Sequence, residues 1–470
     1  MTTPASTAPV NATPQELVER ALSASRSADA IAVVHATSSA NLRWANNTLT
    51  TNGEMRAFEV TVVAFDRRSE GVAAASVSGA VASLDQVLAL VEQADAAAAA
   101  SAPAEDAGEL VGGTVAADWD EPPATTSIGV YDALAPALGS AFDTAQGGGR
   151  ILYGFVDHEV ATTYLGSTTG LRLRHVQPTG HWACTAKPTD LSQSAWVGGA
   201  TRDFADVDPV AMERDLTQRL AWGERRIDLA AGRYDTVLPP TSVADLAIYA
   251  YWSAAARDAH DGQSVYSRRG GGTRVGEQIA SAGVQLRSDP THPGLEAAPF
   301  VVATSSGETT SVFDNGLPLA PTDWIRDGRL TSLVQTRHSA ALTDLPVTPM
   351  VDNLVMSVDG GAGSTEDLVA ATDRGLLVTS LWYIRVVDPQ SLLLTGLTRD
   401  GVYMVEGGEI TGVVNNFRFN ESPVELLHRF SQAGEAVPSF SREWGDYFSR
   451  TVTPALRVPD FNMSSVSQAQ

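Results

Sequence analysis

Runs of strand-forming residues recur along most of this chain, and in its first half they alternate with helical segments. Such runs lie at residues 30–34, 42–45, 58–65 and 71–77. Residues 58–65 alternate imperfectly between apolar and polar side chains, which is typical of a strand largely buried on both faces. Residues 83–100 carry apolar side chains at helical spacing. Another helix is expected after Thr13, which forms a capping-box pattern with Glu16. We therefore predict helices packed on an antiparallel sheet.

A second group of the same kind follows. Its candidate strands are residues 151–156, 159–165 and 171–176. Residues 208–231 have the pattern of a long helix, and Gly232 is suited to end it because glycine readily adopts the left-handed conformation of a C-cap. We place the domain boundary there, with an N-terminal helix-and-sheet domain at 13–232 and a C-terminal domain at 233–470. Residues 1–12, rich in Thr, Ala and Pro, are expected to be disordered.

The last third of the chain is dense in strand and turn signals. Residues 376–384 form a strongly apolar run. Asp400 and Gly401 stand between strand-forming residues, which is a strong local signal for a β-hairpin. Residues 406–409, Glu-Gly-Gly-Glu, then turn the chain into a further strand at 410–414. The predicted fold class is α+β, with a β-rich C-terminal domain.

Composition excludes several classes of protein. The chain is 43% hydrophobic and 19% charged, which is typical of a globular protein. No stretch approaches the roughly 20 apolar residues of a membrane helix, and residues 1–13 lack the pattern of a secretory signal, so we expect a cytoplasmic protein. The formal charge of −23 argues against direct nucleic-acid binding, because such a surface repels phosphates. The single cysteine, Cys184, excludes an intrachain disulfide.

Several segments, in order along the chain, resemble the TldD/PmbA family of metallopeptidase-related proteins. They are Arg-Trp-Ala-Asn-Asn at 43–47, Tyr-Asp-Thr-Val-Leu-Pro at 234–239, Gly-Leu-Leu-Val-Thr-Ser-Leu-Trp-Tyr at 375–383, Thr-Gly-Leu-Thr-Arg-Asp-Gly at 395–401, Glu-Gly-Gly-Glu-Ile at 406–410 and Asn-Asn-Phe-Arg-Phe at 415–419. Together these segments span most of the chain.

The resemblance implies an α+β protein that takes part in peptide hydrolysis. In the zinc-bearing branch of the family, a His-Glu-x-x-x-His motif lies on a helix in the middle of the chain, and a cysteine nearer the C-terminus is a further ligand. That branch cleaves peptides inside a chamber that it forms with a second, related subunit. The second subunit lacks the motif.

The helix expected to carry the motif here, residues 242–259, offers no ligand for zinc. Zinc catalysis needs about three protein ligands and an open position for water. The helix contains neither His nor Glu, and if His260 were the second histidine, the first His and the Glu would fall on Ala255 and Ala256. Residues 456–470 contain no cysteine. We therefore expect no catalytic residue and no cofactor in this chain, and zinc in its partner.

Two other groups contain residue types that bind metals. His158 and Glu159 are the opening pair of a zinc motif, but Thr162 and Thr163 stand where a second histidine is needed, and the surrounding pattern predicts a strand instead of a helix. The other group flanks a predicted turn at 178–180 and consists of His175, His181 and Cys184. We interpret both groups as ordinary strand and turn residues.

Seven residues are candidates for contact with a partner subunit or a peptide. Three aromatic residues lie where relatives hold the metal, and aromatic side chains suit interfaces; simple core packing is the alternative explanation. An Arg-Asp pair at the predicted hairpin either orients a peptide, stabilises an interface with the partner or simply forms the turn. Two asparagines either bond an extended peptide or form a turn. The seven are Tyr249, Tyr251, Trp252, Arg399, Asp400, Asn46 and Asn47.

The leading hypothesis is a non-catalytic subunit of a TldD/TldE-type heteromeric zinc metallopeptidase, which processes or degrades small or unfolded peptides. Its partner would be a TldD-like, zinc-bearing subunit. One alternative is an active metallopeptidase with unconventional ligands, which predicts zinc in the chain purified alone. The other is a stand-alone peptide-binding or scaffolding protein, which predicts a stable homo-oligomer and no co-purifying relative.

Overall fold

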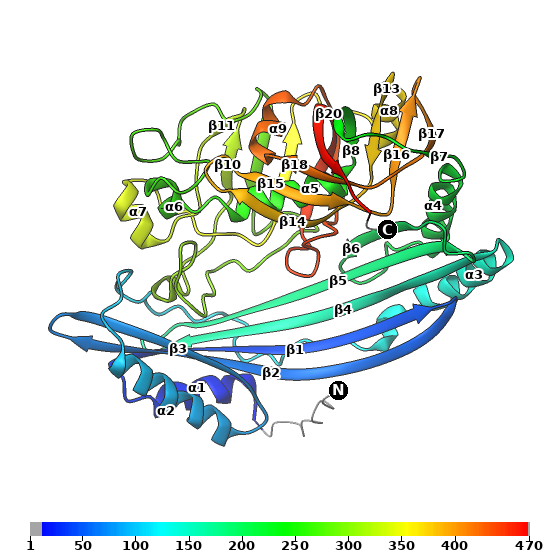
Figure 1. The fold of residues 1–470 in the computed structure, drawn as a ribbon. Helices are drawn as coiled ribbons and strands as arrows, with labels where there is room; N and C mark the ends of the chain where they lie inside the picture. The colour runs from blue at the N-terminus through cyan, green and yellow to red at the C-terminus, as the bar shows by residue number, and fades with distance from the viewer. Residues whose placement is uncertain (1–11, 469–470) are drawn as a thin grey trace.

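The computed structural model describes residues 12–468, which form two β-sheet bodies, one above the other in Figure 1. The first sheet lies within residues 29–201 and the second within residues 226–466. This arrangement confirms the predicted α+β class with a β-rich C-terminal part. The prediction of disorder at 1–12 falls, apart from Ala12, outside the described residues. Within the described part of the chain, no helix has the length and apolar character needed to cross a bilayer.

The first sheet has six antiparallel strands in the order β3-β2-β1-β4-β5-β6. They are β1 (Asp29–Ala45), β2 (Thr48–Arg68), β3 (Gly71–Val81), β4 (Arg150–Ser167), β5 (Arg172–Pro188) and β6 (Ala195–Thr201). Strands β1 and β4 each join two of the predicted strands, because the polar residues at the predicted breaks alternate in burial with their neighbours and so continue the strand. The predicted turn at 178–180 is also wrong, since it lies inside β5 and pairs with β4.

Helices close the side of this sheet that faces away from the second sheet. They are α1 (Pro14–Ala24), α2 (Leu84–Ala100), η1 (Ile128–Tyr131), α3 (Leu134–Gly147) and α4 (Pro209–Trp222). The predicted capping box of α1 is confirmed by reciprocal hydrogen bonds between Thr13 and Glu16. The predicted helix at 208–231 is too long, because α4 is capped at Gly223 and Gly232 opens a strand instead.

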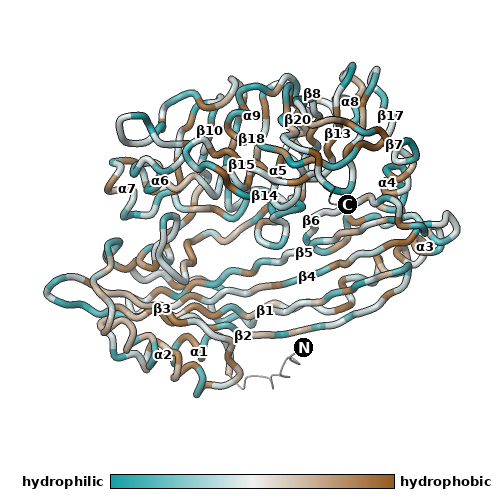
Figure 2. The backbone as a smooth tube through the Cα atoms, viewed as in Figure 1, coloured by the Kyte–Doolittle hydropathy of each residue, from teal (hydrophilic) through white to brown (hydrophobic). Residues whose placement is uncertain are grey.

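The second sheet has fourteen strands, and helix α5 packs against its β20. The strands are β7 (Arg226–Ile227), β8 (Gly232–Leu238), β9 (Val284–Ser288), β10 (Thr322–Arg326), β11 (Arg329–Leu330), β12 (Leu354–Val358), β13 (Arg374–Val378), β14 (Leu381–Asp388), β15 (Leu393–Thr398), β16 (Val402–Glu406), β17 (Glu409–Val414), β18 (Phe417–Glu421), β19 (Gln432–Ser439) and β20 (Thr451–Val466). The helices are α5 (Pro240–Trp252), α6 (Ala256–His260), η2 (Val312–Asp314), α7 (Arg337–Thr343), α8 (Thr365–Ala370) and α9 (Pro423–Arg429). Figure 2 shows hydrophobic positions along strands and helices of both bodies, consistent with a separate core in each.

The two glycine-containing turns predicted in the last third have different outcomes. The turn at 406–409 is confirmed, because β16 and β17 pair across Gly407 and Gly408, both with positive φ. The hairpin at Asp400 and Gly401 is wrong. Both residues do have positive φ, but β15 pairs with β14 and β18, whereas β16 pairs with β13 and β17. The connection from β15 to β16 through Asp400 and Gly401 therefore takes the chain from one part of the sheet to another.

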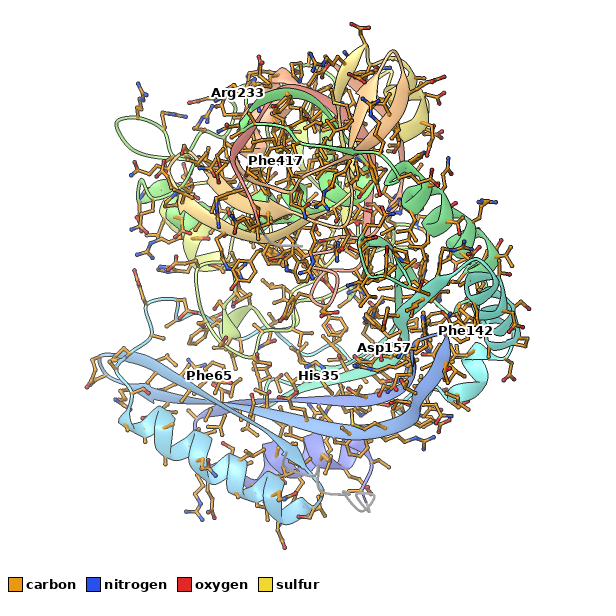
Figure 3. All side chains as sticks on the ribbon, turned by 45° about the vertical axis from the view of Figure 1, so that its right-hand side comes forward. His35, Phe65, Phe142, Asp157, Arg233 and Phe417 are labelled. Carbon is orange, nitrogen blue, oxygen red and sulfur yellow. The ribbon has the colours of Figure 1, made fainter. Side chains whose placement is uncertain are left out.

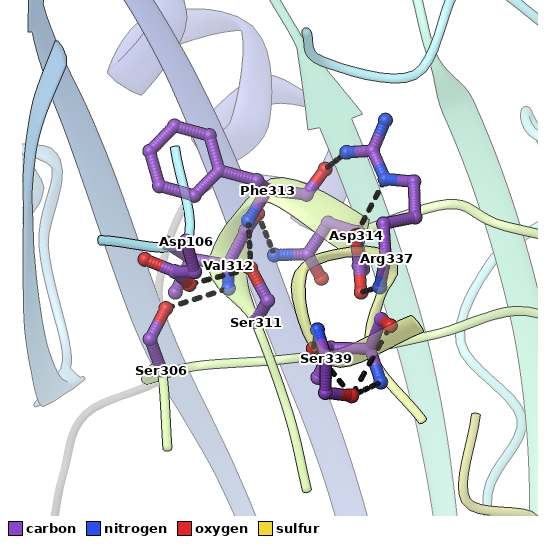
Figure 4. Close-up of polar contacts among 10 residues, drawn as sticks. Asp106, Ser306, Ser311, Val312, Phe313, Asp314, Arg337 and Ser339 are labelled. Atoms are coloured by element: carbon purple, nitrogen blue, oxygen red, sulfur yellow. Dashed lines mark hydrogen bonds and ion pairs between the residues drawn. The ribbon is translucent and has the colours of Figure 1, made fainter. Parts of the chain in front are cut away.

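Two of the places where the bodies meet differ in character. At the junction we call apolar, Val312 and Phe313 pack on the first sheet, where Phe313 lies 5.0 Å from Phe65 between ring centroids. Polar contacts surround it, among them an Arg337–Asp314 ion pair (Figure 4). At the second place, the loop at 440–450 between β19 and β20 reaches toward the middle of β5 (Figure 1).

Candidate functional site

Helix α5 occupies the place where the sequence predicted the family's metal helix, and it is shorter than expected. It ends at Trp252, and a separate helix, α6, begins at Ala256 after the extended Ala255. Both alanines are buried, with 2% and 0% of their surface exposed. No group of three or more His, Cys, Asp or Glu side chains within residues 12–468 is arranged to hold a metal. The residues present here do not fit a zinc ion, because methyl groups offer no donor atom.

The three aromatic residues of α5 lie in different environments. Tyr251 is 1% exposed, and its hydroxyl bonds both to the amide nitrogen (2.8 Å) and to the carbonyl oxygen (3.0 Å) of Val351. This side chain is part of the core and cannot reach another molecule in this conformation. Tyr249 and Trp252 are half-buried, with ring centroids 5.6 and 5.3 Å from that of Trp444 in the 440–450 loop. These two rings are the part of the predicted aromatic surface that remains accessible.

A buried carboxyl on α5 anchors the same loop. Asp245 is fully buried, and one of its oxygens accepts hydrogen bonds from the Ser441 hydroxyl (2.5 Å) and the Glu443 amide (3.0 Å). The other oxygen has no hydrogen-bond partner within residues 12–468. Burial raises the pKa of Asp245 to about 7 despite these two bonds. Sequence reasoning missed this residue; its only signal was an acidic side chain in an otherwise apolar helix.

The loop also carries a buried ion pair of the second body, Arg442 with Asp400, whose contacts with Ser194 and Trp196 of the first body form what we call the polar junction. Arg442 pairs with Asp400, and its guanidinium lies between Trp196 of β6 and Trp382 of β14, 4.7 and 5.3 Å from the ring centroids. Asp400 also accepts a hydrogen bond from Ser194. Burial alone would raise the pKa of Asp400, but the Arg442 charge and the Ser194 bond outweigh it and lower the pKa. The sequence prediction found Asp400, but not Arg442.

Arg399 lies beside this pair and is more accessible. Its guanidinium is 3.5 Å from Asp400 and 5.7 Å from the ring centroid of Trp382. Asp400 and Gly401 also line a cavity of about 540 Å³ between the two bodies, which the loop before β6 helps to enclose. Arg399 and Asp400 therefore lie where the two bodies meet.

The face of the first sheet that turns toward the second sheet is polar over its middle. The strand register places His35, Thr163 and His175 side by side across β1, β4 and β5. The His35 Nδ1 lies 3.0 Å from the Thr163 hydroxyl oxygen. A second row holds Asp157 and His181 (Figure 3 labels His35 and Asp157). Burial lowers the pKa of His35 and raises that of Asp157. This face offers hydrogen-bonding groups, as an extended peptide backbone requires.

The 440–450 loop covers one end of this polar face. Phe440 stacks on His181 with ring centroids 6.0 Å apart and planes inclined by 18°. Asp446 lies 3.5 Å from the His181 Nε2, and Arg450 donates to the Thr179 hydroxyl at 3.1 Å. The loop thus contacts β5 through its start, middle and end.

The remaining predicted residues are engaged within the chain. Asn46 and Asn47 form the β1–β2 turn with positive φ, and the Asn47 amide bonds to the Arg150 carbonyl (2.9 Å) and the Leu152 amide nitrogen (2.7 Å). The two asparagines lie at the tip of this hairpin and away from α5, so the structure does not bring the seven candidates into one site.

The two groups of possible metal ligands do not assemble. Both ring nitrogens of His158 are engaged, with Thr126 and the Arg202 carbonyl, and Glu159 points to the opposite face of β4. His175 and His181 share one face of β5, whereas Cys184 is buried on the other. The interpretation of these residues as ordinary strand residues fits this placement.

Comparison with known proteins agrees with this architecture. Residues 231–465 match a family model described as the PmbA/TldA metallopeptidase C-terminal domain. No curated protein matches the chain at a significant level.

Solved structures share the fold over nearly the whole chain. One is TldE from Thermococcus kodakarensis, with a TM-score of 0.71, 16% identity, and coverage of 95% of this chain and 99% of that one. Another is a proposed modulator of a DNA gyrase from Thermotoga maritima, with a TM-score of 0.72, 17% identity, and coverage of 95% of this chain and 99% of that one. A third is a proposed modulator of DNA gyrase from Bacteroides thetaiotaomicron, with a TM-score of 0.73, 12% identity, and coverage of 96% of this chain and 98% of that one. Because the family model covers half of the sequence, the chain belongs to the PmbA/TldD family of metallopeptidase-related proteins.

Proposed function

We propose that this chain is a non-catalytic subunit of a heteromeric zinc metallopeptidase, and that a TldD-like relative supplies the metal. The observation that carries the proposal is that the expected metal segment lacks donors: if His260 stood for the second histidine of the motif, its first histidine and its glutamate would fall on the buried Ala255 and Ala256. The fold of the family is kept while the donor atoms are missing. A protein under selection as a stand-alone zinc enzyme would not keep methyl groups there.

We further propose small or unfolded peptides as the substrates of the complex, which would act in the cytoplasm. The polar face of the first sheet supports this substrate class, because its Thr and His side chains match the donors and acceptors of an extended backbone. The half-buried rings of Tyr249 and Trp252 are the proposed contacts with the partner or the peptide, together with Arg399. The net charge of −23 supports the absence of a nucleic-acid ligand.

The test is purification of the tagged chain from its own cells, followed by identification of bound proteins and metal analysis. We expect a companion chain with a His-Glu-x-x-x-His motif, zinc bound in proportion to that companion, and peptide hydrolysis by the complex only. Stoichiometric zinc and hydrolysis in this chain alone would overturn the proposal. Recovery of the chain with no relative would favour a stand-alone peptide-binding protein.

A pair of variants locates the contact. We expect Trp252→Ala to reduce recovery of the companion, because it removes a large, half-buried ring at the end of α5. Val115→Ala is the matched control, since Val115 is 66% exposed on the first body and far from α5 in sequence and structure. Equal recovery with both variants would exclude Trp252 from the interface.

A further inference from the structure

Along about half of β2, the outer edge of the strand is not paired with another strand. β2 pairs with β1 along nearly its whole length, but its pairing with β3 begins only at Phe58, opposite Val81. No strand within residues 12–468 pairs with the other side of residues 48–57. We call these ten residues the free edge. Their outward-facing main-chain groups have no main-chain partner within residues 12–468, and such an edge is a template for another strand.

The free edge also contributes little to the core of its own chain. Nine of its ten residues are exposed and only Gly53 is partly covered, with Leu49 at 50% and Met55 at 61% exposure. The other edge of the sheet, β6, is short, and its first three residues are buried. A strand that buries neither face and pairs on one side is held only weakly. An ordered strand of this length is therefore easier to explain if something pairs with it.

The sequence of the free edge has none of the usual defences against pairing. It contains no Pro and no Lys, and its charged residues are one Glu and one Arg. Gly53 lies in the middle of it without a positive φ, and a Cβ added there would meet no atom within 4 Å. No contact among the described residues explains a glycine at that position. A glycine inside a strand often marks a place where another backbone approaches closely.

We propose that the free edge pairs antiparallel with the free edge of a second copy of this chain, about a two-fold axis that passes by Gly53. This register pairs residues 49–57 of both copies, leaves β3 undisturbed and keeps the same face of both copies toward their second sheets. An axis at Asn52 would give an overlap of equal length, residues 48–56, and we choose Gly53 because a glycine allows the closest approach of two backbones. The register about Gly53 sets Glu54 opposite Asn52, and Met55 opposite Thr51. Moving the axis to Glu54 would set two carboxylates opposite each other, which destabilises a sheet, and would push the added strand toward Val81 of β3.

Self-pairing extends two six-stranded sheets into one continuous sheet and uses an isologous contact, as closed dimers do. The free edge is separate from α5, so the rings of Tyr249 and Trp252 stay available for the zinc-bearing relative. The inference therefore does not depend on the proposed function. A homodimer and the recovery of a relative are independent observations.

The first test is a symmetric disulfide. Opposite residues of an antiparallel pair have Cα atoms about 4.5–5.5 Å apart, which suits a disulfide. Gly53→Cys should therefore cross-link two copies under mild oxidation. The native Cys184 is fully buried, so we expect it to form no cross-link. Ala57→Cys is the matched control, because in this register it lies roughly 27 Å from its copy along the strand. A cross-link at Ala57→Cys but not at Gly53→Cys would overturn the proposal, as would a Gly53→Cys cross-link only to a different protein.

The second test needs no covalent bond. Light scattering should give twice the 49.4 kDa of one chain, and the double change Thr51→Lys and Met55→Lys should restore the mass of one chain by blocking the edge. Ala80→Lys, exposed on β3, is the matched control and should leave the dimer intact. A single-chain mass for the unmodified protein would refute the pairing, as would a dimer insensitive to the double change. Circular dichroism checks folding, and if the double variant is unfolded, the disulfide result decides.

Discussion

The apolar junction and the polar junction between the two bodies depend on different kinds of interaction. The apolar junction rests on close packing of Phe65, Val312 and Phe313, all at most 3% exposed. The polar junction rests on the Arg442–Asp400 pair between two tryptophans. Packing tolerates substitutions of similar volume, whereas a buried ion pair fails when either partner is removed. The polar junction is therefore the more sensitive link, and it lies beside the half-buried rings of α5.

The largest effect should come from breaking the buried ion pair. Arg442→Ala would leave the Asp400 charge uncompensated, and we expect a loss of about 3–5 kcal/mol in the free energy of unfolding. Since the pairing lowers the pKa of Asp400, its contribution is complete above the ordinary pKa of an aspartate and is lost as the pH falls through the lower folded value. Urea unfolding at neutral pH measures the loss.

A double change separates the charge from the packing in that experiment. Asp400→Asn together with Arg442→Met removes both charges and keeps most of the volume, so it should recover much of the stability lost in Arg442→Ala. If the double variant is as unstable as the single one, the polar junction depends on packing around the tryptophans and the contrast between the junctions disappears.

The next effect should appear as a pH dependence. Asp245 has a folded pKa of about 7, above the ordinary value near 3.9, so between these values the folded state binds more protons and stability falls as the pH rises. Asp245→Asn should remove this fall, which is on the order of 2–4 kcal/mol across the window. Unfolding curves at several pH values test it, and Asp446→Asn, 77% exposed, is the matched control. An unchanged slope in Asp245→Asn would place the titration elsewhere.

A smaller effect is expected at the apolar junction. Phe313→Leu keeps an apolar side chain but loses the ring contact with Phe65, so we expect a loss of about 1–2 kcal/mol. The loss should not change between neutral and mildly acidic pH, since no charge is involved. A loss as large as that of Arg442→Ala would show that the two junctions are equally sensitive.

The smallest effect should come from a surface ion pair between the two bodies. Arg202 and Glu296 approach to 3.6 Å with 63% and 48% of their side chains exposed. Solvent screens such a pair, so Glu296→Gln should change the stability by less than about 1 kcal/mol. A clearly larger loss of stability in a thermal melt would mean that this contact also holds the two bodies together.

Local sequence patterns determined the fold class, the capping box of α1 and the turn at 406–409. Each depends on residues close together in the chain, where spacing and side-chain type decide the outcome. The absence of His and Glu from the expected metal helix needed no coordinates.

Only the tertiary structure decided which strands pair and which candidates meet. The hairpin at Asp400 failed because the partners of β15 and β16 come from distant parts of the chain, and a local turn signal cannot specify them. For the same reason the sequence could not bring Arg442 to Asp400, or assign Tyr251 to the core and leave Trp252 accessible. Burial and pairing are set by residues far apart in sequence, and so is the bare edge of β2.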